Sequence, residues 1–214
     1  MRAIAVPVKS LSEAKSRLAP ALTPLERGAL TLAMLEDVLD AAQAMTGWET
    51  WVVSPDEAVL EIAARRRARA LTEDKPPLSS AIRQVEQEVI EAGADTLAVL
   101  LGDTALVTPE ALTRALHTLG RVVVAPDTDA SGTNLLVRRP PRAIAARFGP
   151  DSYRRHLESA ETRGVPAAVV ELDELAFDLD GPGDILTLLQ TRREGRTRQV
   201  CLDMDLRSRI QIRT

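Results

Sequence analysis

The feature that most constrains the fold of this chain is the alternation of short apolar runs with longer runs of helical periodicity. The short runs are rich in β-branched residues and include "RAIAVPV", "WETWVVS", "DTLAVLLGD" and "RVVVAPD". In the longer runs, leucines recur at spacings of three and four, as in "TPLERGALTLAMLEDVLDAAQAM". Because this β-α order continues over nearly the whole chain, it predicts a doubly wound α/β sheet, mostly parallel, with helices on both faces.

Local signals mark where helices begin and end. Thr23 is predicted to be an N-cap, because Pro24 follows it and Glu26 stands three residues on, which is the pattern of a capping box. Gly93 and Gly164 are predicted to stop two later helices. In sheets of this class, ligands bind at the carboxyl ends of the strands. The polar residues that directly follow each strand are therefore the candidates for function.

The length and composition fit one domain. A chain of 214 residues, of which 45% are hydrophobic, can bury one sizeable core. We predict a single domain over residues 1–192. Residues 193–214 form a charged tail with alternating apolar residues near its end. We expect this tail to add an edge strand or to contact a second subunit in a homodimer.

Charge and cysteine content exclude several classes of function. The formal net charge is −4, so lysine and arginine are not in the excess that a nucleic-acid-binding protein requires. A single cysteine, Cys201, excludes an intramolecular disulfide and a multi-cysteine zinc site. The opening apolar run is too short for a signal peptide, and no run reaches the length of a membrane span. We therefore expect a cytoplasmic protein with no nucleic-acid or membrane partner.

Three basic residues follow the first predicted strand, in "AVPVKSLSEAKSRL". Lys9 and Lys15 are compact cations suited to phosphate, and Arg17 adds a forked donor. One interpretation is that they converge on an anion at the edge of the sheet. The alternative is an ordinary solvated loop, which is common for exposed charges.

Aspartates follow two other predicted strands. Asp103 ends the most apolar of the strand-like runs, where a carboxylate can hold a divalent ion or can cap the next turn. Asp178, Asp180 and Asp184 stand together in "FDLDGPGDI". Either a cation lies among them, or Asp184 caps the last helix and the others face water. We expect Asp178 and Asp180 to point to opposite sides, so that only one of them faces the site.

Small donor-rich segments complete the set of candidates. Ser131 and Thr133 lie in "DASGTNLLV", whose small residues allow backbone amides to approach an anion. Gly149 and Ser152 stand at a predicted helix start, which favours phosphate or carboxylate but also fits a simple cap. The two histidines, His117 and His156, are isolated. We interpret both as surface residues of helices and assign neither a catalytic role.

Together these residues suit a polyphosphate, a magnesium ion and an anionic acceptor. The opening segment, "DASGTNLLV", "ARFGPDSYRRHLESAETRGV" and "FDLDGPGDI" also occur in an order that resembles the 2-phospho-L-lactate guanylyltransferases, which include phosphoenolpyruvate guanylyltransferases. The resemblance covers roughly residues 3–190. Its most specific parts are the Gly-Thr-Asn and Phe-Gly-x-x-Ser segments, because the opening segment is shared with other nucleotidyltransferases.

The resemblance implies a fold like that of nucleotide-diphospho-sugar transferases, and a reaction in the biosynthesis of the deazaflavin coenzyme F-420. GMP would pass from GTP to a phosphorylated three-carbon acid, which is 2-phospho-L-lactate, phosphoenolpyruvate or 3-phosphoglycerate, and pyrophosphate would leave. It also implies roles for single residues. Lys9, Lys15 and Arg17 would contact the triphosphate, Asp103 and Asp180 would hold Mg²⁺, and Thr133, Gly149 and Ser152 would bind the acceptor.

Two positions depart from the pattern of that family. Ala105 stands where the family usually has a proline, and Ser79 stands where it usually has an asparagine expected to contact the nucleotide. These differences keep two alternatives open. One is a nucleotidyltransferase with a different base or acceptor, such as a sugar phosphate. The other is a non-catalytic relative that binds nucleotide or a partner protein.

Overall fold

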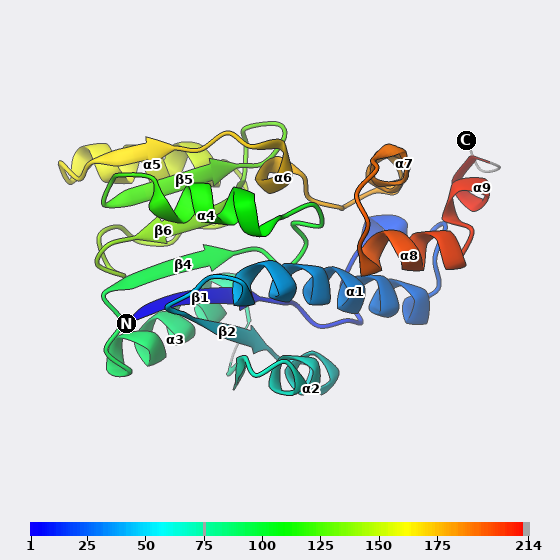
Figure 1. The fold of residues 1–214 in the computed structure, drawn as a ribbon, viewed down its shortest axis with the longest axis horizontal. Coiled ribbons are helices and arrows are strands. Elements are labelled where there is room, and N and C mark those ends of the chain that lie inside the picture. Colours follow the sequence, from blue (N-terminus) through cyan, green and yellow to red (C-terminus); the bar gives the residue numbers. More distant parts are fainter. Residues whose placement is uncertain (75, 212–214) are drawn as a thin grey trace.

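The computed structural model describes residues 1–74 and 76–211, and it places a central sheet between two layers of helices (Figure 1). The sheet has seven strands in the order β3-β2-β1-β4-β6-β5-β7. Among the described strands, β6 runs antiparallel to its neighbours β4 and β5, and the other pairs are parallel. The prediction of a doubly wound, mostly parallel sheet is confirmed.

The elements alternate along the chain as the sequence pattern indicates. The strands are β1 (Arg2–Pro7), β2 (Trp48–Ser54), β3 (Arg69–Thr72), β4 (Thr96–Leu100), β5 (Val122–Pro126), β6 (Thr133–Arg138) and β7 (Ala167–Val169). The helices are the 3₁₀ helix η1 (Ser16–Leu18), α1 (Pro24–Gln43), α2 (Glu57–Arg65), α3 (Leu78–Glu91), α4 (Pro109–His117), α5 (Ser152–Thr162), α6 (Asp173–Ala176), α7 (Pro182–Gln190), α8 (Arg196–Asp203) and α9 (Leu206–Gln211). The loop 127–132 is too short for the crossover that a parallel pair requires, so β6 returns antiparallel to β5.

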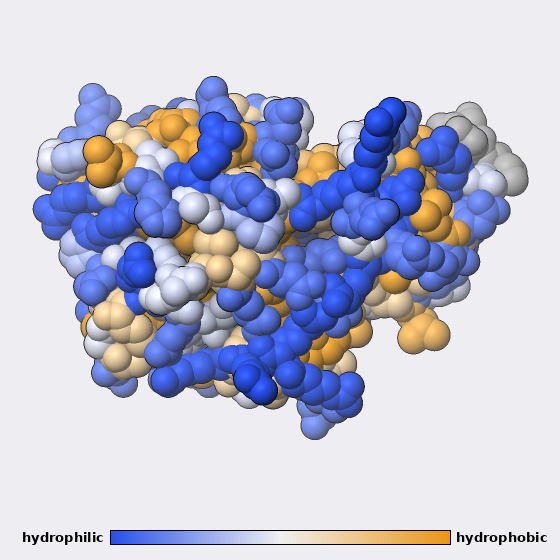
Figure 2. Space-filling model, in the orientation of Figure 1, coloured by the Kyte–Doolittle hydropathy of each residue, from blue (hydrophilic) through white to orange (hydrophobic). Residues whose placement is uncertain are grey.

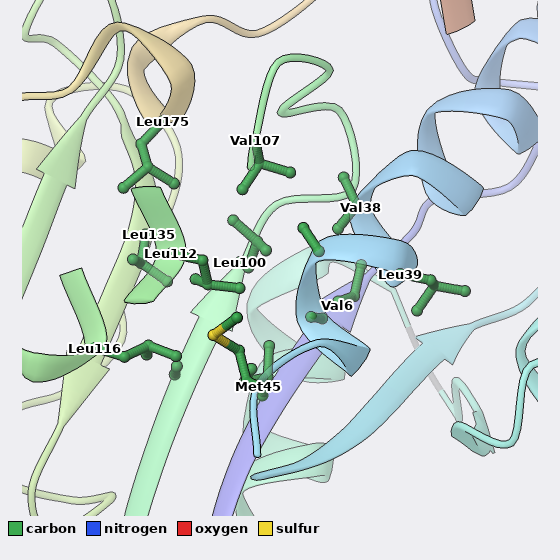
Figure 3. Close-up of a cluster of buried hydrophobic side chains, with 14 of the residues drawn as sticks. Val6, Val38, Leu39, Met45, Leu100, Val107, Leu112, Leu116, Leu135 and Leu175 are labelled. Atoms are coloured by element: carbon green, nitrogen blue, oxygen red, sulfur yellow. The ribbon is translucent and has the colours of Figure 1, made fainter. Parts of the chain in front are cut away.

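The central strands are buried on both faces, which explains why they are continuous apolar runs. In β1, Ile4 and Val6 belong to the cluster that packs under α1 and α4, and Ala5 belongs to the cluster under α3. Figure 3 shows the first of these clusters, in which Val38, Leu100 and Leu112 approach one another from α1, β4 and α4. The opposite face is covered by α3 and α5.

The start of α1 has the predicted capping box. The Thr23 side chain accepts a hydrogen bond from the backbone N–H of Glu26, and the Glu26 carboxylate accepts one from the backbone N–H of Thr23. Pro24 is the first residue of the helix. Two of the free backbone donors at this helix end are satisfied by side chains only three residues apart, which is why the sequence alone located the helix start.

The C-terminal segment differs from its prediction. Its described part, residues 193–211, forms α8 and α9, which gather with α7 beside the N-terminal half of α1 (Figure 1). The edge-strand alternative is therefore wrong for these residues. The Asp37 carboxylate of α1 accepts hydrogen bonds from the backbone N–H groups of Arg196 and Thr197, and so caps α8 from outside its own segment. The boundary at residue 192 and the subunit contact stay predictions.

Glu26 joins this C-terminal segment to the start of α1. Arg209 donates to Oε1 of Glu26 at 2.6 Å and to Oε2 at 3.1 Å. Hydrogen bonds from Arg209, and then from the backbone of Thr23, lower the pKa of Glu26 to about 2. The ordinary pKa of a glutamate is 4.5. The stabilisation of the fold by ionised Glu26 is therefore complete above about pH 4.5 and is lost as the pH falls towards 2.

We expect Glu26→Ala to lower the free energy of unfolding by about 1–2 kcal/mol at neutral pH, because it removes a capping-box partner and an ion pair. The difference from the unmutated protein should shrink at about pH 3.5, because there the Glu26 carboxyl group is largely protonated in the unfolded chain while it is still ionised in the folded protein. Urea unfolding at both pH values measures this. Glu57→Ala is the control, since Glu57 is an exposed residue in the first turn of α2. An equal loss at both pH values would contradict the prediction.

Hydrophilic residues predominate on the face drawn in Figure 2, and the apolar ones lie in separate patches between them. No helix within residues 1–74 and 76–211 is both long and apolar enough to cross a membrane.

Candidate active site

The carboxyl ends of β1 and β4 bring the first basic loop and Asp103 together. These strands are parallel neighbours, with Ile4 beside Ala98 and Ala5 beside Val99. The chain leaves β1 into the loop that carries Lys9 and Lys15, and it leaves β4 through Leu101 into Gly102 and Asp103. A side chain at Gly102 would lie 3.0 Å from Val8 and 3.3 Å from the Pro7 carbonyl oxygen, so glycine allows the two strand ends to approach each other closely.

Lys15 is the centre of the site. Its ammonium donates to Oδ2 of Asp103 at 2.8 Å and to Oδ1 of Asp180 at 2.9 Å. The lysine side chain is only 7% exposed. Burial works against its charge, but the attraction of Asp103 and then of Asp180 outweighs it and raises the Lys15 pKa. The structure therefore brings together three residues that the sequence predicted for one site.

The other predicted cations lie around this trio. Lys9 is exposed and lines the same pocket. Arg17 is 77% exposed, and its Nη1 lies 3.6 Å from Oδ2 of Asp180. The backbone of Lys15 has a φ of 52°, a left-handed conformation that residues other than glycine adopt only at a cost. Its two ion pairs hold it there.

A pocket of about 310 Å³ opens at this edge of the sheet. Three basic side chains, of Lys9, Lys15 and Arg17, line it together with three acidic ones, of Glu13, Asp103 and Asp180. Apolar walls are formed by residues that include Val8, Met34, Leu78 and Leu101. The positive charge of the pocket is thus balanced by its own carboxylates, and a polyphosphate bound here would leave negative charge in excess.

Asp178 and Asp180 lie on one side of their segment, which corrects the expectation that they point apart. Residues two apart on an extended segment share a face, and the buried Leu179 between them faces the core. The Leu179 N–H donates to the Asp103 carbonyl oxygen at 3.2 Å, so this segment runs alongside the end of β4. Burial, and then the charges of Asp103 and Asp180, raise the pKa of Asp178 to about 6.

Two residues outside the predicted set hold the acidic segment in place. The side-chain amide of Asn134 in β6 donates to the carbonyl oxygens of Leu175 at 3.0 Å and of Ala176 at 2.9 Å. The Asp184 carboxylate accepts from the backbone N–H of Gly181 at 2.7 Å, as expected for a cap of α7, and from that of Asp180 at 2.9 Å. Sequence analysis passed over Asn134, although a buried amide in the apolar run "TNLLV" was the signal for a structural role.

The predicted acceptor residues form a second group, at the start of β6 and the start of α5. Thr133 begins β6, Gly149 precedes α5, and Ser152 is the first residue of α5. None of the three lines the pocket. Thr133 and Ser152 are buried, and Gly149 is exposed with a φ of 108° that disfavours any other residue. The Ser152 N–H donates to the Gly149 carbonyl oxygen at 3.0 Å, which joins two of the three.

His156 is not the surface residue that sequence analysis predicted. Its side chain is fully buried, and its ring bonds Thr133 and the backbone of Arg147. The buried residues Ser152, His156 and Ala160 are spaced by four on α5, so they form one helix face that packs inward. That spacing was the overlooked signal. His117 is exposed, as predicted.

Ser79 is the second residue of α3 and is half-buried, directly after Leu78, which lines the pocket. Its proposed contact with the nucleotide stays a prediction.

Within the described residues, no group of three or more histidine, cysteine, aspartate or glutamate side chains is arranged to hold a metal ion. The donor set nevertheless fits Mg²⁺, because that ion is commonly bound by one or two carboxylates together with substrate phosphates. Oδ2 of Asp103 and Oδ1 of Asp180 already converge on a single cation, the Lys15 ammonium.

Comparison with known proteins adds independent information. A family model described as "Guanylyl transferase CofC like" matches residues 1–208. The chain is 43% identical over 184 residues to a phosphoenolpyruvate guanylyltransferase of Sphaerobacter thermophilus, covering 84% of this chain and 88% of that protein. It is 36% identical to a 3-phospho-D-glycerate guanylyltransferase of Phenylobacterium zucineum, with coverages of 92% and 94%. It is 35% identical to a 2-phospho-L-lactate guanylyltransferase of Haloferax volcanii, with coverages of 90% and 87%.

The fold is likewise similar to solved structures. A protein of Desulfovibrio desulfuricans G20, described as a nucleotide-diphospho-sugar transferase, superposes with a TM-score of 0.77 at 18% identity and covers 99% of this chain and 98% of its own. This likeness confirms the predicted fold class.

Proposed function

This chain belongs to the family of CofC-like guanylyl transferases, and from that membership we propose that it joins GMP from GTP to a phosphorylated three-carbon acid. A phosphate oxygen of the acid attacks the α-phosphorus of GTP. The bond from that phosphorus to the bridging oxygen breaks, and pyrophosphate leaves. The observation that carries the proposal is the convergence of Lys15 with Asp103 and Asp180 at the carboxyl ends of the parallel strands.

The chemistry needs no general base, because the attacking phosphate is already ionised. Catalysis then rests on alignment of the two substrates and on neutralisation of charge at the α-phosphate. Lys15 and Arg17 would supply positive charge in the pocket, together with Lys9, which lines it near the start of the loop after β1. These are the residues that we assign to the triphosphate.

We assign Mg²⁺ to Asp103 and Asp180. The charges that line the pocket balance one another, so a bound triphosphate calls for a further cation. When bound, Mg²⁺ would neutralise charge on the phosphates. The two carboxylate oxygens that now accept from Lys15 would hold it, and the Lys15 ammonium would then be free to contact the phosphates. Asp178 shares the face of Asp180 and is kept as the alternative ligand.

We assign Thr133, Gly149 and Ser152 to the acceptor acid. They come from segments that meet at the start of α5, where the helix dipole favours an anion. Phosphoenolpyruvate, 3-phosphoglycerate and 2-phospho-L-lactate are the candidates, because relatives are named for each of them. The product would enter the biosynthesis of coenzyme F-420, and we place the reaction in the cytoplasm. A homodimer and the absence of a nucleic-acid partner remain predictions.

The test is a coupled pyrophosphate assay on the full chain. GTP, ATP, CTP and UTP are each combined with the three acids, with and without Mg²⁺. We expect release only with Mg²⁺, fastest with GTP and one of these acids. A strong preference for another nucleotide would show that the protein uses a base other than guanine. The variant Ser79→Asn would then test whether this position sets the base preference. No release with any pair would overturn the enzymatic function.

A further inference from the structure

His156 has both ring nitrogens bonded within the protein. Its Nδ1 lies 3.0 Å from Oγ1 of Thr133, and its Nε2 lies 2.9 Å from the backbone nitrogen of Arg147. The Phe148 ring packs against the imidazole edge to face, with centroids 5.3 Å apart. The side chain has no exposed surface. A ring held at both ends in this way has a single orientation.

The partners determine where the proton of the ring lies. A backbone N–H can only donate, so Nε2 accepts from Arg147 and the proton is on Nδ1, which donates to the Thr133 hydroxyl oxygen. A protonated ring could not accept from Arg147. Burial, and then the positive charges of Arg138, Arg155 and Arg147, lower the His156 pKa to about 3. The neutral ring, with one donor and one acceptor, is the form present at neutral pH.

The ring connects the three segments that carry the acceptor residues. Thr133 itself is one partner, and Arg147, the other, stands two residues before Gly149. His156 lies on α5, one turn beyond Ser152. Thr133 and Arg147 are 23 and 9 residues away from His156 along the chain, so no local backbone pattern fixes the relative positions of the three segments.

We propose that His156 is a positioning residue for guanylyl transfer, whose imidazole holds Thr133, the backbone before Gly149 and the start of α5 in the arrangement that binds the acceptor anion. The inference rests on the proposed function, because that function assigns the acceptor to these segments. Neither hydrogen-bond partner of the imidazole, Thr133 or Arg147, lines the nucleotide pocket around Lys15. Loss of His156 should therefore affect the acceptor and leave the nucleotide unaffected.

Three variants separate the two bonds. His156→Leu removes both. The amide nitrogen of asparagine takes the place of Nδ1, so His156→Asn keeps the donor to Thr133 and loses the acceptor for Arg147. The amide oxygen of glutamine reaches the place of Nε2, so His156→Gln keeps the acceptor for Arg147 and loses the donor to Thr133. The two amide variants also remain informative if His156→Leu does not fold.

The measurement is steady-state kinetics of pyrophosphate release, with the acid that the unmutated protein uses fastest. We expect His156→Leu to raise the KM for the acid at least about tenfold and to leave the KM for GTP within about twofold, since uniform loss of binding to one substrate raises its KM alone. The KM for the acid of His156→Asn and of His156→Gln should lie between the values for His156→Leu and the unmutated protein, because each variant retains one of the two hydrogen bonds. Melting temperatures are recorded for every variant.

Two controls separate positioning from stability. His117→Gln changes the exposed histidine and should alter neither KM. Leu116→Ala creates a cavity in the cluster under α1 and α4, and so lowers stability away from His156. If this control raises the KM for the acid as much as His156→Leu, or if the His156 variants raise both KM values equally, the positioning role is overturned. Absence of transfer by the unmutated protein would instead overturn the proposed function and, with it, this inference.

Discussion

Replacing Asp103 by asparagine is expected to reduce guanylyl transfer at least about 100-fold, the scale seen when one preorganised electrostatic group is removed from an active site. The substitution keeps the shape of the side chain but removes one of the two charges that converge on Lys15. With one charge gone, the affinity for Mg²⁺ should fall, and the ammonium would be held by Asp180 alone. Pyrophosphate release with GTP, Mg²⁺ and the preferred acid measures the effect.

The matched control is Asp129→Asn, in the loop between β5 and β6. Asp129 is exposed and lies outside the pocket, so the same chemical change should leave the rate within about twofold. Raising the Mg²⁺ concentration should recover part of the activity of Asp103→Asn if the loss is one of metal affinity. Full activity of Asp103→Asn at low Mg²⁺ would contradict both the metal assignment and the electrostatic role.

Lys15→Met is expected to produce the second large effect, because it removes the positive charge and keeps the length of the side chain. Within the described part of the chain, no cation then lies between Asp103 and Asp180, and only Asp180 keeps an ion pair, with Arg17. The free energy of unfolding should therefore fall by about 1–3 kcal/mol in the absence of metal. The rate of transfer should fall about 100-fold, since a cation beside the triphosphate is lost. Urea unfolding and pyrophosphate release measure the two losses separately.

The response of Lys15→Met to Mg²⁺ distinguishes the two roles of this lysine. In the unmutated protein the ammonium already occupies the space between the carboxylates, so Mg²⁺ must displace it. In the variant that competition is absent, and added Mg²⁺ should raise the melting temperature by more than in the unmutated protein. Lys9→Met is the control, because Lys9 lines the pocket without an ion pair to either aspartate among the described contacts. An equal response of both variants would show that Lys15 does not occupy the metal position.

Much of the architecture was predictable because the signals for it are local. Thr23 and Glu26 stand three residues apart and form the capping box that their spacing indicates. The strand β1 is apolar throughout because helices cover both of its faces. The C-terminal segment was misjudged because its strand-like alternation is outweighed by tertiary contacts. Its helix α8 is capped by Asp37, more than 150 residues away along the chain.

The site was predictable in outline for a related reason. Since parallel strands end at one edge of a sheet, Lys15 and Asp103 could be placed together once the strands were recognised. Asp178 and His156 were misplaced. That Asp178 and Asp180 lie on one side of their segment follows from Leu179, which enters the core between them. The interior position of His156 follows from the packing of α5, which its neighbours four residues away, Ser152 and Ala160, also indicate.

The sequence by itself therefore determined the order of the elements, the capped start of α1, the doubly wound sheet and the edge at which the functional groups gather. These depend on the periodicity of apolar residues and on turn chemistry within a few positions. Only the tertiary structure decided which groups touch. Lys15 meets Asp103 and Asp180 across 88 and 165 residues of chain, and His156 meets Thr133 across 23. Contacts over such separations are set by how the helices pack on the sheet, because no local preference of the backbone extends that far.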